Sequence, residues 1–153
     1  MNRVVLAVVL STGLIATGAV SASAASTRAE YIVQVDPICE ASNQGLTRLW
    51  KRFVRADKQH KLHTAGNALA AIATNLVSSD AKLQAIPPPP GDEARVSQWL
   101  GMFDQIAHNY KISASAYRLG KYKRVSRLID RSDRLNRNAD SLMADFPFQV
   151  CAQ

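Results

Sequence analysis

Apolar residues recur along most of this sequence at alternating three- and four-residue intervals, the spacing of one face of an amphipathic helix. Strand-like alternation of apolar and polar residues is absent. The spacing predicts four helices, over residues 37–58, 62–86, 93–119 and 121–146. The positions expected to face the core are Cys39, Ser42, Leu46, Leu49, Phe53, Ala56, Leu62, Ala65, Leu69, Ile72, Leu76, Ser79, Leu83, Ile86, Val96, Trp99, Phe103, Ile106, Tyr110, Ser113, Tyr117, Val125, Leu128, Ser132, Leu135, Ala139, Leu142 and Phe146.

Residues that favour helix starts mark several of these boundaries. Asp36 and Pro37 suit the start of the first long helix, because aspartate accepts bonds from unpaired N–H groups and proline loses no bond at the first helical position. Thr27 and Glu30 fit a capping box, which predicts a short helical turn before that helix. Asp92 is expected to cap the third helix.

The links between the helices predict how the helices are arranged. Four prolines at residues 87–90 end the second helix, Gly120 suits a left-handed stop after the third, and Pro147 follows the fourth. Similar helix lengths and short links predict an all-α, antiparallel up-down-up-down four-helix bundle, formed as one domain by residues 25–153. The alternative is a bundle in which the long proline link makes a crossover.

The two cysteines test this topology. In an up-and-down bundle, Cys39 near the start of the first long helix and Cys151 just past the fourth lie at the same end. We therefore expect a terminal Cys39–Cys151 disulfide, which an oxidising compartment would allow. Two separate thiols are the alternative.

Residues 1–24 have the pattern of a secretory signal peptide. Arg3 precedes an uncharged apolar stretch at residues 4–20, and Ala22-Ser23-Ala24 fits a cleavage site before Ala25. The expected location is secreted or extracytoplasmic, at the cell envelope. An uncleaved anchor is the alternative, because the apolar stretch reaches the lower limit for a membrane span. We expect no span in the mature chain.

Composition adds an uneven distribution of charge. The sequence has 19 Lys and Arg against 12 Asp and Glu. Residues 48–61 carry a net charge of +5, residues 108–134 carry +6, and the rest of the mature chain carries −5. In the predicted bundle both basic segments lie toward one end, away from the disulfide. The residues expected to contact anionic envelope components there are Arg48, Arg52, Arg55, Lys121, Lys123, Arg124, Arg127 and Arg131.

Other candidate chemistry is sparse. His60, His63 and His108 lie toward the basic end, where surface histidines are expected in preference to a metal site. Motifs for nucleophilic, metal-dependent or phosphate-binding catalysis are absent, so neither catalytic residues nor cofactors are expected.

Two sets of side chains leave an alternative open. The serines on the four helical seams either line a cavity or allow close helix approach, and close approach is the favoured interpretation. The larger aromatic side chains either line a ligand pocket or belong to the core and its boundary, and the core is favoured. These aromatic residues are Trp50, Trp99, Tyr110, Tyr117 and Tyr122.

The order of several short motifs resembles a family of small exported helical proteins of unknown function from high-GC Gram-positive bacteria. The motifs are Tyr31-Ile32-Val33-Gln34-Val35-Asp36-Pro37-Ile38-Cys39 with Asn43, the proline-rich link with an acidic helix start at residues 87–93, Trp99-Leu100, Leu119-Gly120, Asn138-Ala139 and a near-terminal Cys151. The resemblance implies a helical fold and paired cysteines. It implies no activity, cofactor or catalytic residue. Many such proteins look like lipoproteins, whereas this sequence has the Ala22-Ser23-Ala24 site.

These observations predict an exported, non-enzymatic helical-bundle protein that acts in binding or in the envelope and whose basic end contacts anionic surfaces. Solvated charged faces with no partner are the plainer interpretation of that end. A small-molecule carrier or sensor-like bundle, with its ligand between the helices, is the alternative function, and an enzyme using the histidines is a weaker third. Nucleic acid is not an expected partner, because the basic segments lack a recognised motif.

Overall fold

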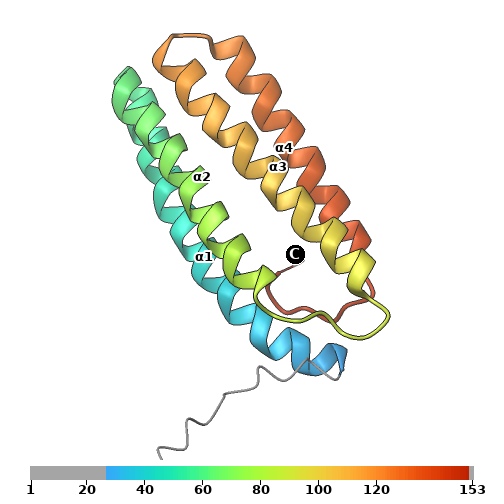
Figure 1. The fold of residues 1–153 in the computed structure, drawn as a ribbon. Coiled ribbons are helices and arrows are strands. Elements are labelled where there is room, and N and C mark those ends of the chain that lie inside the picture. The colour runs from blue at the N-terminus through green and yellow to red at the C-terminus, as the bar shows by residue number, and fades with distance from the viewer. Residues whose placement is uncertain (1–26, 152–153) are drawn as a thin grey trace, which may run out of the picture.

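The computed structural model describes residues 27–151, which form an all-α four-helix bundle (Figure 1). Its helices are α1 (Arg28–Lys58), α2 (Leu62–Gln84), α3 (Glu93–Arg118) and α4 (Tyr122–Leu142). The described part of the chain contains no strand.

Consecutive helices are antiparallel neighbours: α1 packs on α2, α2 on α3, and α3 on α4. The proline-rich link passes over one end of the bundle to the adjacent helix and makes no crossover. The predicted up-down-up-down topology is therefore confirmed. The predicted signal peptide at residues 1–24 lies outside the described residues.

The start of α1 differs from the sequence prediction. Thr27 is the N-cap, and its hydroxyl oxygen accepts a hydrogen bond from the backbone N–H of Glu30 at 3.2 Å. The cap is as predicted, but it begins the long helix itself. The expected separate turn, followed by a new helix at Pro37, is wrong.

Pro37 lies inside α1 because the turns before it are held by the core. Proline has no N–H and removes one bond from the helical ladder. Tyr31, Ile32 and Val35 are all buried in this segment, and Tyr31 and Val35 are 0% exposed. Burial of these three apolar side chains offsets the missing bond.

Two further expectations, the end of the fourth helix and the capping role of Asp92, need correction. α4 ends at Leu142 instead of residue 146, because the chain must turn back across the bundle end to bury Phe146 and Phe148. Asp92 occupies the N-cap position of α3, but its side chain makes no capping bond. Its carboxylate is bound by Arg28 instead, as described below.

The core has two clusters, one toward each end of the bundle. The end that holds the Cys39–Cys151 disulfide, here called the disulfide end, is rich in aromatic residues. Its largest buried members are Tyr31, Leu83, Trp99, Met143, Phe146 and Phe148. The opposite end, with the turns at residues 59–61 and 119–121, is here called the basic end. Its cluster uses smaller side chains around Phe53, Ala65, Leu69, Ile72, Ala114, Tyr117 and Val125.

Gly66 lets α2 and α3 approach closely near the basic end. A β-carbon at this position would lie 2.9 Å from the carbonyl oxygen of Ala114 on α3. Because that neighbour is backbone, it cannot move aside cheaply. Glycine is therefore required where α2 and α3 meet.

Candidate functional site

The first and last helices of the bundle do not meet. No Cα atom of α1 lies within 8 Å of a Cα atom of α4, although both helices are described over their whole lengths. A four-helix bundle with all its sides packed would bring these two helices together as well. The bundle is therefore open along one side.

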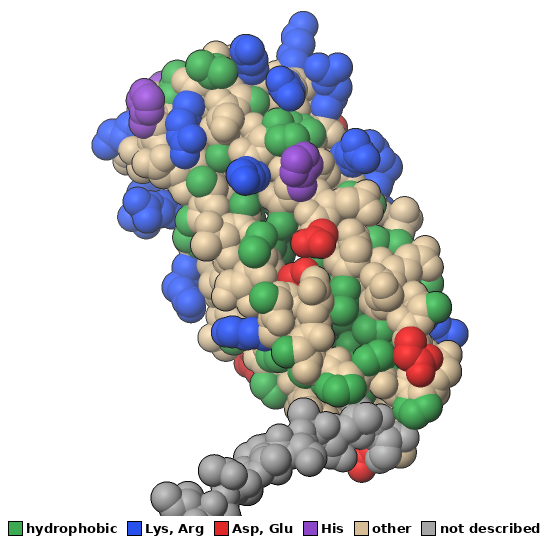
Figure 2. Space-filling model, viewed as in Figure 1, with side chains coloured by type: hydrophobic (Ala, Val, Ile, Leu, Met, Phe, Trp, Pro, Cys, Tyr) green, Lys and Arg blue, Asp and Glu red, His purple; other side chains and the backbone are tan. Residues whose placement is uncertain are grey.

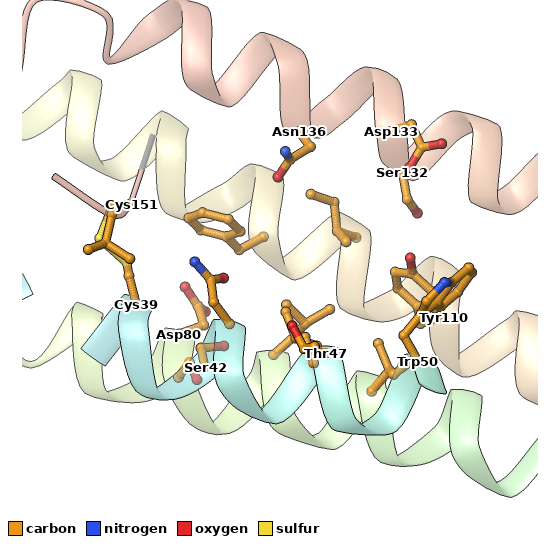
Figure 3. Close-up of a pocket in the computed structure, with 18 of the residues that line it drawn as sticks. Cys39, Ser42, Thr47, Trp50, Asp80, Tyr110, Ser132, Asp133, Asn136 and Cys151 are labelled. Carbon is orange, nitrogen blue, oxygen red and sulfur yellow. A yellow bond between two sulfur atoms is a disulfide. The ribbon is translucent and has the colours of Figure 1, made fainter. Parts of the chain in front are cut away.

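A cavity of about 640 Å³ lies in this open side (Figure 3). α2 and α3 contribute mainly apolar side chains, α1 contributes both kinds, and the side chains from α4 are all polar or charged. The apolar lining residues are Leu46, Ile72, Leu76, Leu83, Phe103, Ile106 and Val150. The polar and charged ones include Asn43, Thr47, Lys51, Ser79, Asp80, Tyr110, Asp133, Asn136, Arg137 and Asp140.

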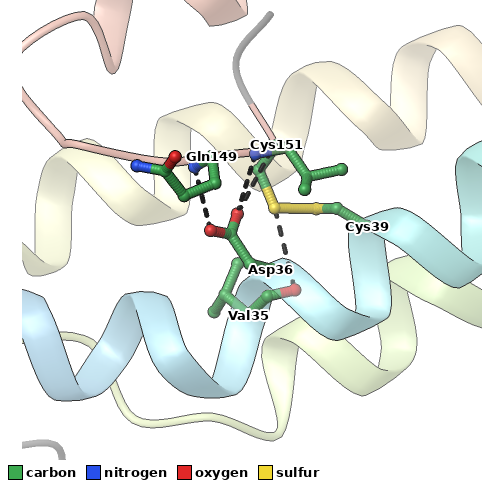
Figure 4. Close-up of a disulfide and its surroundings, with 6 residues drawn as sticks. Val35, Asp36, Cys39, Gln149 and Cys151 are labelled. Atoms are coloured by element: carbon green, nitrogen blue, oxygen red, sulfur yellow. Dashed lines mark hydrogen bonds between the residues drawn. A yellow bond between two sulfur atoms is a disulfide. The ribbon is translucent and has the colours of Figure 1, made fainter.

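The predicted disulfide closes one end of the cavity. Cys39 and Cys151 are joined, with their Cα atoms 5.3 Å apart, and both line the cavity. The bond is confirmed, and the alternative of two separate thiols is excluded. It fixes the C-terminal segment, residues 143–151, across the gap from α4 to α1 (Figures 1 and 4).

Asp36 adds a second attachment for the C-terminal segment (Figure 4). Its carboxylate accepts backbone N–H bonds from Gln149 at 2.9 Å and from Val150 and Cys151 at 3.3 Å. Sequence reasoning gave Asp36 the role of a helix cap. Its actual role is to bind the returning chain.

An ionic cluster joins three parts of the disulfide end. Arg28 donates two hydrogen bonds to Asp92, at 2.6 and 2.8 Å, and one to Asp145 at 3.0 Å. Arg95 also pairs with Asp145. The Arg28 guanidinium holds the pKa of Asp92 below its usual value, and Arg95, followed by Arg28, lowers the pKa of Asp145. The cluster therefore ties the start of α1 to the start of α3 and to the chain beyond α4.

Asp80 is a buried acid at the cavity. Its residue is 4% exposed, Gln84 donates a hydrogen bond to Oδ2, and Oδ1 has no hydrogen-bond partner among the described residues. Burial, followed by the nearby charge of Asp104, raises the pKa of Asp80 to about 6. The carboxyl group is therefore still mainly ionised at neutral pH, with one oxygen unpaired.

Three of the four seam serines line the cavity, so the less favoured interpretation is the correct one for them. Ser42, Ser79 and Ser132 are all lining residues, whereas Ser113 is not. Ser42 donates to Asn75 at 2.9 Å, and Ser132 accepts from Asn109 at 3.2 Å. Small side chains at these positions leave space that a Leu or Phe would fill.

Two of the five aromatic residues line the cavity, and the other three do not. Trp50 and Tyr110 line the cavity, at the end away from the disulfide, near Ser132 and Asp133 (Figure 3). Burial, followed by the charge of Asp133, raises the pKa of Tyr110. The other three are Trp99 and Tyr117 in the two core clusters and Tyr122, which is exposed.

The predicted anion-contacting residues all lie toward the basic end and are exposed. Arg48, Arg52 and Arg55 are on the second half of α1, Lys121 is in the turn before α4, and the first half of α4 carries Lys123, Arg124, Arg127 and Arg131. Figure 2 shows Lys and Arg side chains gathered over the part of the molecule where Figure 1 places the two turns. Tyr117 donates a hydrogen bond to Asp57, which joins α3 to α1 at this end.

The histidines are separated from the cavity, because neither His60, His63 nor His108 is a lining residue. Within residues 27–151, no group of three or more His, Cys, Asp or Glu side chains has the arrangement of a metal site. In the same part of the chain, no helix is both long and apolar enough to span a bilayer.

No protein family, curated protein or solved structure that was compared with this chain matches it. Its functional interpretation therefore depends on the geometry described above.

Proposed function

We propose that the protein is an exported, non-enzymatic binding protein that holds a small, largely apolar molecule in the cavity between α1 and α4. One observation carries this proposal: a cavity of about 640 Å³ with an apolar floor and a polar rim, closed at one end by a covalently fixed segment. Sites for small molecules in proteins are concave, mainly apolar, and roughly 300–1,000 Å³ in volume.

The volume favours a small molecule over a peptide helix. A helix with its side chains is about 10 Å across, so a piece as long as the cavity wall on α1 would occupy roughly 1,400 Å³. That is more than twice the volume of the cavity, so a bound helix would have to lie largely outside it. The disulfide and the C-terminal segment would also block a helix that extended past the cavity end.

The lining supports binding without catalysis. Its two cysteines are joined to each other, and no histidine is present in the lining. The lining therefore offers neither a free thiol as nucleophile nor a histidine as general base. The disulfide and the expected signal peptide both support export.

The test is a titration with N-phenyl-1-naphthylamine, an uncharged apolar fluorophore, on wild type and two single variants. Asn136→Trp places a large side chain in the lining, whereas Asn138→Trp adds the same side chain at an exposed position of α4 outside the lining. We expect one molecule to bind wild type and Asn138→Trp, with affinity at least tenfold lower in Asn136→Trp. Equal binding to both variants, or none to wild type, would contradict the proposal.

A second candidate function is attachment of the basic end to an anionic lipid surface, which supports the envelope location expected from the sequence. It is favoured by the exposed cations that the two turns bring to one end of the bundle. Such a charge patch attracts anionic surfaces strongly at low salt and weakly at high salt. It is compatible with the cavity proposal, because the two sites use different residues.

Vesicle sedimentation tests this second function. We expect binding to vesicles that contain phosphatidylglycerol, loss of binding at high salt, and little binding to phosphatidylcholine alone. Arg127→Glu should weaken binding several-fold, whereas Lys82→Glu, the same charge change on exposed α2 surface, should have less effect. Binding that ignores both salt and Arg127→Glu would contradict it.

A further inference from the structure

We infer that the molecule bound in the cavity carries a cationic group, such as a substituted ammonium, on an apolar body. The cationic group would lie at the end formed by Trp50, Tyr110 and Asp133. This inference rests on the proposed function and adds the chemical class of its ligand.

Two aromatic side chains form the surface at this end. Trp50 comes from α1 and Tyr110 from α3, and both line the same end of the cavity (Figure 3). The Trp50 side chain is large and apolar, yet the residue is 40% exposed. Indole and phenol rings attract cations to their faces, and aromatic cages use this attraction to bind quaternary ammonium groups.

A carboxylate lies beside these rings. Asp133 is on α4, lines the cavity, and is close enough to Tyr110 to influence its ionisation. No salt bridge within 4.0 Å pairs Asp133 with a cation among residues 27–151. A ligand cation could therefore pair with this carboxylate without displacing an existing partner.

The lining as a whole carries charges of both signs. Asp80, Asp133 and Asp140 are acidic, whereas Lys51 and Arg137 are basic. Asp80 is fixed in the interior and has an oxygen without a hydrogen-bond partner. Lys51 and Arg137 are exposed, and their long side chains can keep their charges in water. Asp133 is exposed as well, so the fully buried charge of the lining is the negative charge of Asp80, which lies nearer the disulfide than Trp50 and Tyr110 do (Figure 3).

The apolar body of the ligand would extend from this end toward the disulfide. Leu46, Ile72 and Leu76 continue the lining from Trp50 toward the disulfide, where Leu83, Phe103 and Val150 lie. The disulfide end is closed by the C-terminal segment. A cationic head beside Trp50 and Tyr110 would thus leave a single apolar chain lying along Leu46, Ile72 and Leu76.

Lys51 is the main competitor for this assignment, because it lines the same end and would attract an anionic head. Lys51 also allows the sign of the ligand's charge to be tested. If the ligand is cationic, removing the Lys51 charge strengthens binding and removing the Asp133 charge weakens it. An anionic ligand requires the opposite responses.

Three molecules with the same ten-carbon chain test the inference: decyltrimethylammonium, decanol and decanoate, all below their micelle concentrations. We expect wild type to bind decyltrimethylammonium about tenfold more tightly than decanol. Decanoate should bind most weakly. Asp133→Asn should abolish most of the preference for the cation, Lys51→Gln should increase it, and Asp130→Asn, an exposed control outside the lining on the same helix, should leave it unchanged.

The other outcomes would contradict either this inference or the proposed function. If decanol binds as tightly as the cation, or if decanoate binds best, the inference is wrong and the cavity proposal still stands. If N-phenyl-1-naphthylamine binds but none of the three chains does, the inference is also wrong. If neither the fluorophore nor any chain binds, the proposed function itself fails.

Discussion

The two ends of this bundle are stabilised by different means. At the disulfide end, a covalent bond, an ionic cluster and stacked aromatic rings join α1, α3 and the chain beyond α4. At the basic end, short turns connect the helices, and the core consists mainly of smaller side chains. Only the disulfide end has a segment that crosses from α4 to α1. This difference gives the cavity one closed end.

The charges on α1 and α4 would oppose closure of the gap between them at the basic end. The second half of α1 and the first half of α4 both carry several exposed Arg and Lys residues, and they lie at the same end of the bundle. Like charges at the same level oppose close approach of two helices. The C-terminal segment bridges the gap at the disulfide end, where it is covalently bonded to α1. The rest of the gap stays open.

The largest effect should follow loss of the disulfide. Replacing both cysteines, by Cys39→Ser and Cys151→Ser, should lower the free energy of unfolding by about 4–5 kcal/mol, since the bond restricts a loop of more than 100 residues in the unfolded chain. Urea unfolding of oxidised wild type and of the variant measures this. A loss below about 1 kcal/mol would mean that the non-covalent contacts alone hold the disulfide end.

The next largest effect is a difference in stability cost between substitutions on two faces of α2, one in the packed core and one at the cavity. Leu69 is 0% exposed in the basic-end core, so Leu69→Ala should cost about 3 kcal/mol through lost burial and the void it leaves. Leu76 is half-buried and already borders the cavity. Leu76→Ala should cost about 1 kcal/mol. Equal costs would indicate that the cavity wall is packed as tightly as the core.

Sequence patterns predicted the packed parts of the molecule well. The helical spacing located the buried faces, because residues such as Leu69, Trp99 and Val125 must be removed from water in any bundle of these helices. The disulfide followed from the topology, because Cys39 and Cys151 lie at the same end of a bundle whose helices alternate in direction.

The cavity was less predictable, because it depends on what the helices do not contact. A helical seam has the same spacing whether or not a partner covers it, so Leu46 and Asn136 gave no sign of an open side. The serines were the available signal, since small polar residues at seam positions fit a cavity as well as they fit close packing. Asp36 and Asp92 were also misassigned, because a capping residue and an acid that binds a distant group look the same in sequence.

The third effect depends on pH. The pKa of Asp80 is raised to about 6 in the folded protein, so ionised Asp80 reduces stability above that pH, and the reduction disappears below about pH 4, where the unfolded chain is protonated as well. Between pH 4 and 7, wild type should therefore lose roughly 2 kcal/mol relative to Asp80→Asn. Thermal unfolding of both proteins across this range measures the difference.

Asp104→Asn is the control for that experiment. It removes the neighbouring charge that helps to raise the pKa of Asp80, so the dependence on pH should become smaller but persist, because burial is the larger cause. Identical pH profiles for wild type and Asp80→Asn would contradict the assignment.

The smallest effects are expected for alanine substitutions of glycines in one turn at each end of the bundle. Gly91 and Gly120 have φ values of +88° and +66°, so alanine at either position should cost about 1 kcal/mol. Gly101 provides the matched control: it lies inside α3 with open space around its Cα, and Gly101→Ala should stabilise the protein by about 0.5–1 kcal/mol. The same sign at all three positions, measured by thermal unfolding, would contradict this comparison.

The most direct test of the central claim is to map the binding site by nuclear magnetic resonance, using ¹⁵N-labelled oxidised protein titrated with N-phenyl-1-naphthylamine. The account predicts that amide signals shift for residues in the cavity lining, such as Asn43, Leu46 and Asn136, and stay in place for Arg127 and for Ala65 in the basic-end core. Shifts confined to the basic end, or no shifts at ligand concentrations that saturate fluorescence, would contradict the claim that the open side between α1 and α4 is a binding site.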